Sequence, residues 1–264
     1  MTNLISRAAE EWYGIKADPD NVNKLHEYLC KTYGAINEET IRKVFLSGEA
    51  AAFLTVNETY FFREPAHFSL LKNLLPSFEK TGIKICSAAT STGCEAYSLA
   101  LLIKTFNIPY HIDAFDINPK VIEAACSGIY GARAMREDGS CFHYLAEPYI
   151  KKSQPSAEPE NPQSVEYHVD ASLKKNINFF VHNIMKPLPQ KELYDFIFFR
   201  NAFIYLSAQG RKRILSNLSA ALKEGGLLFL GVSETAGAFH TDFSGENTDD
   251  VFYFKKTTNQ KKLL

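Results

Sequence analysis

The feature that most constrains the fold is a regular alternation of strand-like and helical segments that begins near residue 83. Ile83–Ala88 and His111–Phe115 are strand-like, whereas Glu95–Phe106 between them carries its apolar residues at helical spacing. Strands that alternate with helices are typical of a parallel sheet covered by helices on both faces. The sequence therefore predicts an α/β fold with a doubly wound, mostly parallel sheet.

The same alternation continues towards the C-terminus. The further predicted strands are Asn176–Val181, Phe196–Phe199, Leu227–Val232 and Val251–Phe254, the last of them antiparallel. The further predicted helices are Pro119–Ser127 and Ser207–Lys223. Gly225-Gly226 is predicted to end the second of these helices, and Asp242–Asp250 is predicted to form turns.

Residues 1–55 show helical patterns and no strand pattern. Asp20 is predicted to cap one helix, and a second helix is predicted from Glu38. We therefore expect a small N-terminal helical domain over 1–55 and a main domain over 56–264. Asn57–Glu64 joins them, and Pro65 opens the next helix, where its missing N–H has no cost.

One polar segment interrupts the alternation. Lys151–Val165 contains three prolines and few apolar residues, which predicts a mobile loop over 151–165. The segments on either side predict a small inserted subdomain over about 141–175.

Composition excludes several classes of protein. The 264 residues, 45% of them hydrophobic, suffice for one sizeable core with a small appended domain. The net charge of −1 lacks the basic excess of nucleic-acid and membrane-surface binders. No apolar run reaches the roughly 18 residues that predict a membrane-spanning helix. The five cysteines are scattered and contain no CxxC pair, which predicts reduced thiols and a cytoplasmic location. The sequence also lacks an HExxH motif, so no metal site is predicted.

The turn after the first predicted strand, Ala89–Glu95, lies where α/β folds hold a nucleotide-like ligand. It contains one glycine, Gly93, and lacks the GxGxxG spacing of a dinucleotide site. A cofactor without a pyrophosphate group fits this turn better, and S-adenosylmethionine (SAM) is one. The alternative is a plain turn with a capping box from Thr92 to Glu95.

Two polar residues follow other predicted strands. Asp116 stands 23 residues after Gly93 and could accept hydrogen bonds from ribose hydroxyls, or it could cap the helix before Pro119. Asn183 could read an adenine edge with its amide, or it could be a turn residue.

Arg200 and Asn201 end a very apolar strand, which places a cation at the ligand-binding edge of the sheet. A buried Arg200 needs a carboxylate, either from SAM or from a protein glutamate in a structural ion pair. Tyr205 could face the reacting centre or simply pack. The loop Asn57–Glu64, with Arg63, could close over a charged ligand, or it could join two domains and bury its phenylalanines.

From roughly Lys31 to Phe254 the chain resembles the CheR-type methyltransferases, which methylate glutamates on bacterial chemotaxis receptors with SAM. Its matching motifs are Asn57-x-Thr59-x-Phe61-Phe62-Arg63, Ser91-Thr92-Gly93-Cys94-Glu95-Ala96-Tyr97-Ser98, Asp116-Ile117-Asn118, Ser127-Gly128-Ile129-Tyr130, Phe198-Phe199-Arg200-Asn201-Ala202-Phe203-Ile204-Tyr205-Leu206 and Gly225-Gly226-Leu227-Leu228-Phe229-Leu230-Gly231-Val232-Ser233-Glu234.

The resemblance implies a Rossmann-like SAM domain, a small N-terminal helical domain and an inserted β-subdomain. It also implies roles for individual residues. The residues expected to bind SAM and its product S-adenosylhomocysteine (SAH) are Asn57, Thr59, Arg63, Glu95, Asp116, Asn183, Ile184, Arg200 and Asn201. Tyr205 and Arg63 are expected to be catalytic, Tyr205 near the methyl group and Arg63 near the carboxylate end of SAM. The acceptor carboxylate is already ionised at neutral pH, so no strong general base is needed.

The chain departs from the family pattern at two places. Cys94 and Ala96 replace an acidic residue and a proline beside the glycine turn. Residues 1–55 hold six Lys and Arg against eight Asp and Glu, with Arg42-Lys43 as the one basic pair to contact chemoreceptor helices. The alternatives are therefore a SAM-dependent methyltransferase of another protein or of a small molecule, or a non-catalytic module that binds SAM or SAH.

Overall fold

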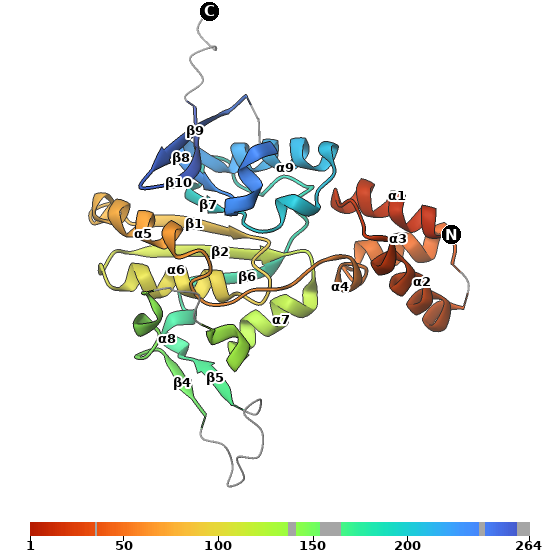
Figure 1. The fold of residues 1–264 in the computed structure, drawn as a ribbon, viewed down its shortest axis with the longest axis horizontal. Helices are drawn as coiled ribbons and strands as arrows, with labels where there is room; N and C mark the ends of the chain where they lie inside the picture. The colour runs from red at the N-terminus through yellow and green to blue at the C-terminus, as the bar shows by residue number, and fades with distance from the viewer. Residues whose placement is uncertain (35, 137–140, 154–164, 238–240, 258–264) are drawn as a thin grey trace, which may run out of the picture.

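A seven-stranded sheet forms the centre of the computed structural model, which describes residues 1–34, 36–136, 141–153, 165–237 and 241–257 (Figure 1). Its strands are β1 (Ile83–Ala88), β2 (Tyr110–Asp116), β6 (Ile177–Val181), β7 (Tyr194–Phe198), β8 (Leu222–Phe229), β9 (Phe243–Thr248) and β10 (Val251–Lys256). Their order is β6-β2-β1-β7-β8-β10-β9. The first five strands in this order are parallel, and β10 is antiparallel to β8 and β9. The doubly wound, mostly parallel sheet is thus confirmed.

Helices cover both faces of this sheet because its central strands are apolar on both sides. The helices of the main sheet are α5 (Pro65–Leu74), α6 (Cys94–Lys104), α7 (Pro119–Ser127) and α9 (Ala208–Ala221). The buried residues of α5 and α6 belong to one apolar cluster, together with Ile85 and Phe198 of the sheet. Those of α9 belong to a second cluster, together with Cys86 and Ile197, whose side chains point to the opposite face.

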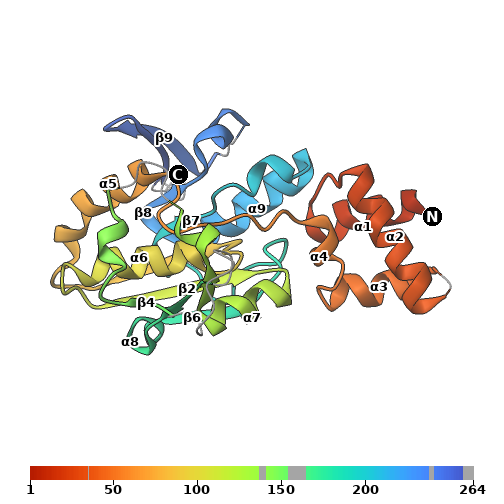
Figure 2. The ribbon, with the colours of Figure 1, turned by 60° about the horizontal axis from the view of Figure 1, so that its bottom comes forward.

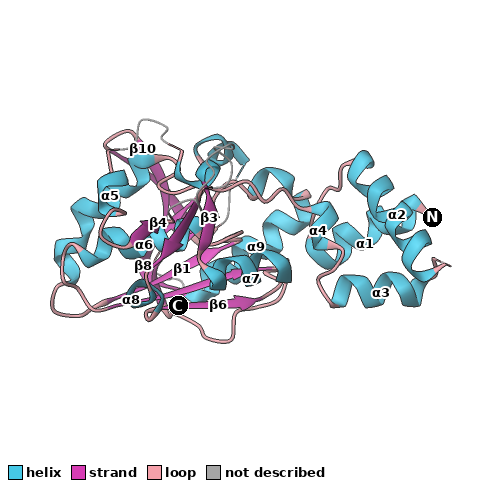
Figure 3. Cartoon of the chain, turned by 90° about the horizontal axis from the view of Figure 1, so that it is seen from below, coloured by secondary structure: helices cyan, strands magenta, loops and turns pink. Residues whose placement is uncertain are grey.

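The first four helices of the chain gather at one end of the molecule (Figures 1 and 2). They are α1 (Thr2–Tyr13), α2 (Pro19–Tyr33), α3 (Glu38–Leu46) and α4 (Ala51–Leu54), and no strand lies among the described residues of this region (Figure 3). Their buried side chains join the same apolar cluster as α9. Asp18, not Asp20 as expected, caps α2, because its side chain accepts hydrogen bonds from the backbone N–H groups of Asp20 and Asn21.

The end of α1 is fixed to the segment before α9 by backbone contacts. The N–H of Lys16 donates to the carbonyl of Tyr205, and the N–H of Ser207 donates to the carbonyl of Gly14, both at 2.8 Å. Gly210 lies so close to Gly14 that a Cβ on it would stand 2.8 Å from the Gly14 Cα. A glycine at this position is what allows the two segments to approach each other.

A second sheet, of three antiparallel strands, projects from the main sheet and comprises β3 (Ile129–Gly131), β5 (Glu166–Val169) and β4 (Ile150–Lys152). The short α8 (Ala171–Lys174) follows it. β3 lies before residue 141, the expected start of the inserted subdomain. A strand of three residues is too short to show an alternating pattern, so the sequence did not reveal it. The expected loop begins later than residue 151, since Lys151 and Lys152 pair with β5; its residues 154–164 lie outside the described part of the chain.

Two other expectations were wrong. The last long helix ends at Ala221, and Gly225-Gly226 lies inside β8, where the pairing with β7 shifts in register and Gly225 takes a φ of 72°. The expected turns at 242–250 form the edge strand β9 and a tight hairpin, whose Asp249 and Asp250 both have positive φ.

The connections between these elements contain short 3₁₀ helices. They are η1 (Leu75–Phe78), η2 (Ala132–Met135), η3 (His143–Leu145), η5 (Phe203–Tyr205) and η6 (Val232–Gly237). In the described ranges, the helices are all too short or too polar to cross a bilayer.

Candidate active site

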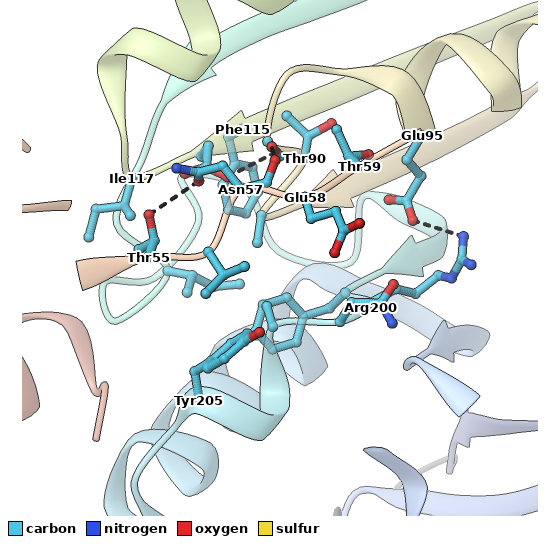
Figure 4. A pocket seen from close by; sticks show the side chains of 18 of the residues that line it. Thr55, Asn57, Glu58, Thr59, Thr90, Glu95, Phe115, Ile117, Arg200 and Tyr205 are labelled. Carbon is cyan, nitrogen blue, oxygen red and sulfur yellow. Dashed lines mark hydrogen bonds and ion pairs between the residues drawn. The ribbon is translucent and has the colours of Figure 1, made fainter. Parts of the chain in front are cut away.

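A cavity lies at the carboxyl ends of the parallel strands, between the main sheet and the N-terminal helices (Figure 4). It encloses about 1070 Å³, including its open mouth. The segments that follow β1, β2, β6 and β7 form its floor, and Tyr13, Ile15 and Leu54 close it from the side of the N-terminal helices. This edge of an open α/β sheet is where such folds bind their ligands.

Every residue that the sequence singled out for cofactor binding or catalysis lines this one cavity. They are Asn57, Thr59, Arg63, Glu95, Asp116, Asn183, Ile184, Arg200, Asn201 and Tyr205. Their individual roles stay predictions. Arg42 and Lys43 lie elsewhere, on the exposed side of α3.

The turn after β1 is shaped by backbone in the left-handed region. Ala89, Ser91 and Gly93 have φ values of 56°, 52° and 86°. A Cβ on Gly93 would stand 2.9 Å from the Cβ of Ala125, so glycine is required both by space and by conformation. The capping box considered for this turn is absent, since Gly93 is the N-cap and Glu95 bonds elsewhere.

Asp116 is buried at the end of β2 and holds two loops together. Its Oδ2 accepts a hydrogen bond from the N–H of Ser91 at 2.9 Å, and its Oδ1 accepts one from the N–H of Asn118 at 3.0 Å. Burial raises the pKa of Asp116 although these backbone donors act in the opposite direction. The helix cap before Pro119 is Asn118, so capping is not the role of Asp116.

Asn183 joins the segment after β6 to the end of α1. Its Nδ2 donates to the carbonyl of Trp12 at 2.7 Å, and its Oδ1 accepts from the N–H of Met185 at 3.0 Å. The hydrogen bond from the Met185 N–H is typical of a turn residue, which agrees with the alternative interpretation of Asn183. Adenine recognition by the same amide stays a prediction.

Arg200 is a buried cation between two carboxylates. Its Nη1 donates to Glu95 Oε2 and its Nη2 to Glu64 Oε2, each at 3.1 Å, and Nη2 also contacts the carbonyl of Arg63. Only 2% of its side chain is exposed. Arg200 thus meets the carboxylates it was expected to need, and they come from protein glutamates, which is the structural ion pair considered as the alternative. Burial raises the pKa of Glu95, against the opposing effects of Arg200 and Ser87.

Glu64 was not singled out from the sequence, although it directly follows Arg63 in the first motif. Its carboxylate accepts hydrogen bonds from Arg200, from Asn201 Nδ2 at 2.8 Å and from the N–H of Val232 at 3.3 Å. His67 Nδ1 lies 3.3 Å away. Burial alone would raise the pKa of Glu64, but these partners outweigh it and hold the pKa well below its usual range.

Glu234, the last residue of the final motif, is a second carboxylate that the sequence reasoning missed, and it is buried. Its oxygens accept from the N–H groups of Asn201 at 2.7 Å, Gly231 at 2.8 Å and Ile204 at 3.1 Å. It therefore fixes the loop that carries Tyr205. Burial raises the pKa of Glu234, while the backbone donors lower it.

Tyr205 stands across the cavity from Asn57 and Thr59 (Figure 4). The loop that carries those two residues is tied to the glycine turn, because Ser91 Oγ donates to the Asn57 carbonyl at 3.0 Å. Phe61 and Phe62 of the same loop are fully buried. The loop thus both lines the cavity and anchors itself in the core. That it closes over a charged ligand stays a prediction.

The two departures from the family pattern lie outside the cavity wall. Cys94 and Ala96 are both fully buried in the apolar cluster around α6, and neither lines the cavity. Among the described residues, His, Cys, Asp and Glu form no group of three or more that could hold a metal ion.

The family model described as CheR methyltransferase, SAM binding domain, matches residues 57–252. The chain belongs to the CheR methyltransferase family. A probable chemotaxis protein methyltransferase of Rhizobium etli is 33% identical over 197 residues, which are 70% of each chain. A chemotaxis protein methyltransferase of Listeria monocytogenes is 27% identical over 85% of this chain and 82% of its own. A probable biofilm formation methyltransferase, WspC of Pseudomonas aeruginosa, is 29% identical over 72% of this chain and 45% of its own.

The cavity of this CheR-family chain suits SAM in three respects. Ile117 and Ile184 line the cavity with apolar side chains, against which a ring such as adenine could pack. The Asp116 carboxylate suits ribose hydroxyls. Glu95 lines the cavity, and it shares the guanidinium of Arg200 with Glu64, so that two carboxylates face this one cation; this would favour a further positive charge beside Glu95, such as the SAM ammonium group. SAM is the cofactor, and the chain is a SAM-dependent methyltransferase.

Proposed function

We propose that the chain transfers methyl groups from SAM to glutamate side chains of a chemoreceptor cytoplasmic domain, in the cytoplasm. The observation that carries this proposal is the arrangement of Tyr205 and Arg63 around one open cavity at the carboxyl ends of the strands. When bound, SAM supplies a methyl group carried by a positively charged sulfur. A glutamate carboxylate is ionised near neutral pH and needs no base to attack it.

The residues of the cavity would then bind, orient and exclude water. Asp116 would hold the ribose, Glu95 the ammonium group, and Asn183 with Ile184 the adenine. Arg63 would lie near the SAM carboxylate, and the Tyr205 hydroxyl near the methyl group. Such positioning supplies roughly 7–11 kcal/mol of barrier reduction in favourable reactions. Residues 1–55 would form a separate domain that contacts the acceptor, with Arg42 and Lys43 as candidate contacts.

The test is methylation of a purified chemoreceptor cytoplasmic domain with isotopically labelled SAM. The proposal predicts a base-labile methyl ester on the receptor, which disappears when the candidate glutamates are replaced by glutamine. Absence of the ester from several receptors, in a preparation that still binds SAH, would refute the proposal.

A second candidate is methylation of a protein that acts outside chemotaxis. Two observations favour it. Acidic residues outnumber basic ones eight to six in residues 1–55, and one relative is named for biofilm formation. A screen of receptor and non-receptor proteins as methyl acceptors separates the two candidates. A non-catalytic role rested on Cys94 and Ala96, which do not line the cavity.

A further inference from the structure

Arginine side chains gather around Glu58 at the mouth of the cavity. Arg136 Nη2 donates to Glu58 Oε1 at 2.9 Å, and Arg63 Nη1 donates to the backbone carbonyl of Glu58 at 2.9 Å. The hydrogen bond from Arg136 and its charge, followed by the charges of Arg63 and Arg133, hold the pKa of Glu58 below its usual range. This corner of the molecule therefore already binds one carboxylate.

Arg136 is held in place although it lies at the surface. Its guanidinium carbon stands 4.0 Å from the centre of the Tyr60 ring, and that of Arg63 stands 5.6 Å from the same ring. The N–H of Phe61 donates to the carbonyl of Ala134 at 2.9 Å, which fixes η2 against the loop. The guanidinium group is thus positioned before any acceptor arrives.

The two arginines face different parts of an incoming acceptor. Arg63, Tyr60 and Glu58 line the cavity, whereas Arg136 is not part of its lining. Glu58 lies across the cavity from Tyr205 (Figure 4). An acceptor that inserts its reacting glutamate beside Tyr205 would therefore bring a neighbouring residue, not the reacting one, to Arg136.

Another carboxylate can easily replace Glu58 as the partner of Arg136. The side chains are 40% and 57% exposed, so water screens the pair and it contributes little to stability. A docked acceptor would exclude that water, and a carboxylate on it would bind Arg136 more strongly than Glu58 does.

We infer that Arg136 determines acceptor specificity by binding an acidic side chain next to the glutamate that is methylated, and that Glu58 occupies Arg136 until the acceptor docks. The inference rests on the proposed function and narrows its substrate to protein segments with at least two neighbouring carboxylates. No covalent change is involved, since one ion pair replaces another.

The experiment measures KM and kcat of receptor methylation for the wild type, Arg136→Ala, Glu58→Gln and the control Arg213→Ala, which removes an exposed arginine of α9. Two receptors are compared, one with its natural acidic neighbours and one with these replaced by glutamine. Arg136→Ala should raise the KM for the acidic receptor about tenfold, with kcat and SAH affinity unchanged, because one charge-assisted hydrogen bond is lost. Glu58→Gln should lower this KM, and Arg213→Ala should leave it unchanged.

On the glutamine receptor, the wild type and Arg136→Ala should have the same KM. Equal KM values for these two enzymes on the acidic receptor would overturn the inference, as would the same increase on both receptors. If Glu58→Gln leaves the KM for the acidic receptor unchanged or raises it, the role of Glu58 is overturned. If the wild type binds SAH but methylates neither receptor, the proposed function fails and the inference fails with it. If the wild type methylates the receptor and Arg136→Ala has the same KM, only the inference is refuted and the proposed function stands.

Discussion

The Glu64 carboxylate accepts a 2.8 Å hydrogen bond from the side-chain amide of Asn201, which stands 137 residues later in the chain. The first motif and the motif after β7 are thereby joined at one point. Asn201 has a φ of 60°, and its own N–H donates to Glu234. Carboxylates from two distant segments thus hold an uncommon backbone conformation at the residue that begins the Tyr205 loop.

Replacing Glu64 with glutamine should destabilise the protein and weaken SAH binding. Glutamine keeps the shape but loses the charge opposite Arg200, and such charge-assisted hydrogen bonds contribute about 1.5–3 kcal/mol. We expect the free energy of unfolding, measured in urea, to fall by about 2 kcal/mol. Glu79→Gln, an exposed change, is the control. Equal unfolding and SAH titration curves for Glu64→Gln and the wild type would contradict this account of Glu64.

Tyr205→Phe should slow methyl transfer with little change in SAH affinity. Tyr205 lines the cavity and is 37% exposed, so its hydroxyl can be removed without loss of core packing. We expect kcat to fall roughly 10- to 100-fold, the range of one hydrogen bond made in the transition state. Steady-state kinetics and calorimetry separate the two effects. A rise in KM at unchanged kcat would assign Tyr205 to binding instead.

Gly210→Ala should destabilise the contact between α1 and α9. Alanine favours a helix by about 1 kcal/mol over glycine, but its Cβ would overlap the backbone of Gly14, which cannot move like a flexible side chain. Overpacking costs about 1–3 kcal/mol, so we expect the free energy of unfolding, measured in urea, to fall by about 1 kcal/mol. Gly131→Ala has no neighbouring atom within 4 Å and is the control. A more stable Gly210→Ala would show that the contact is loose.

His67 should make stability depend on pH. Burial, together with the charge of Arg200, lowers its pKa in the folded state despite the nearby Glu64, whereas an unfolded histidine titrates near about 6.5. Below about pH 6.5 the unfolded chain therefore binds a proton that the folded chain does not, and the free energy of unfolding decreases as the pH falls.

The measurement compares urea unfolding of the wild type and His67→Gln between about pH 5 and 7. The wild type should lose stability more steeply, by at most about 1.4 kcal/mol per pH unit for one group. Parallel pH profiles for the two proteins would show that His67 titrates as it does in the unfolded chain.

The central strands and the place of the site could be predicted from the sequence because local patterns determine them. The β1 boundaries Ile83–Ala88 match the prediction, since apolar side chains on both faces identify a buried parallel strand. Asp116 and Arg200 could be located for a related reason, because carboxyl ends of parallel strands meet at one edge of the sheet.

Other features depend on partners that are distant in sequence. The polar edge strand β9 forms because it pairs with β10, and its own residues resemble a turn. The contact of Asn183 with Trp12, which stands 171 residues earlier, has no local pattern. Glu64 ends the loop Asn57–Glu64 and Glu234 ends the last quoted motif, but only the fold shows that both carboxylates accept hydrogen bonds from Asn201.

The most direct test of the account is calorimetric titration with SAH of the wild type, Asp116→Ala and Asp18→Ala. Asp18 also accepts two backbone hydrogen bonds, but in the cap of α2 and outside the cavity, so it controls for lost stability. The account predicts one-to-one binding for the wild type and Asp18→Ala, and roughly 10- to 100-fold weaker binding for Asp116→Ala. No binding by the wild type, or equal affinity of all three proteins, would contradict it.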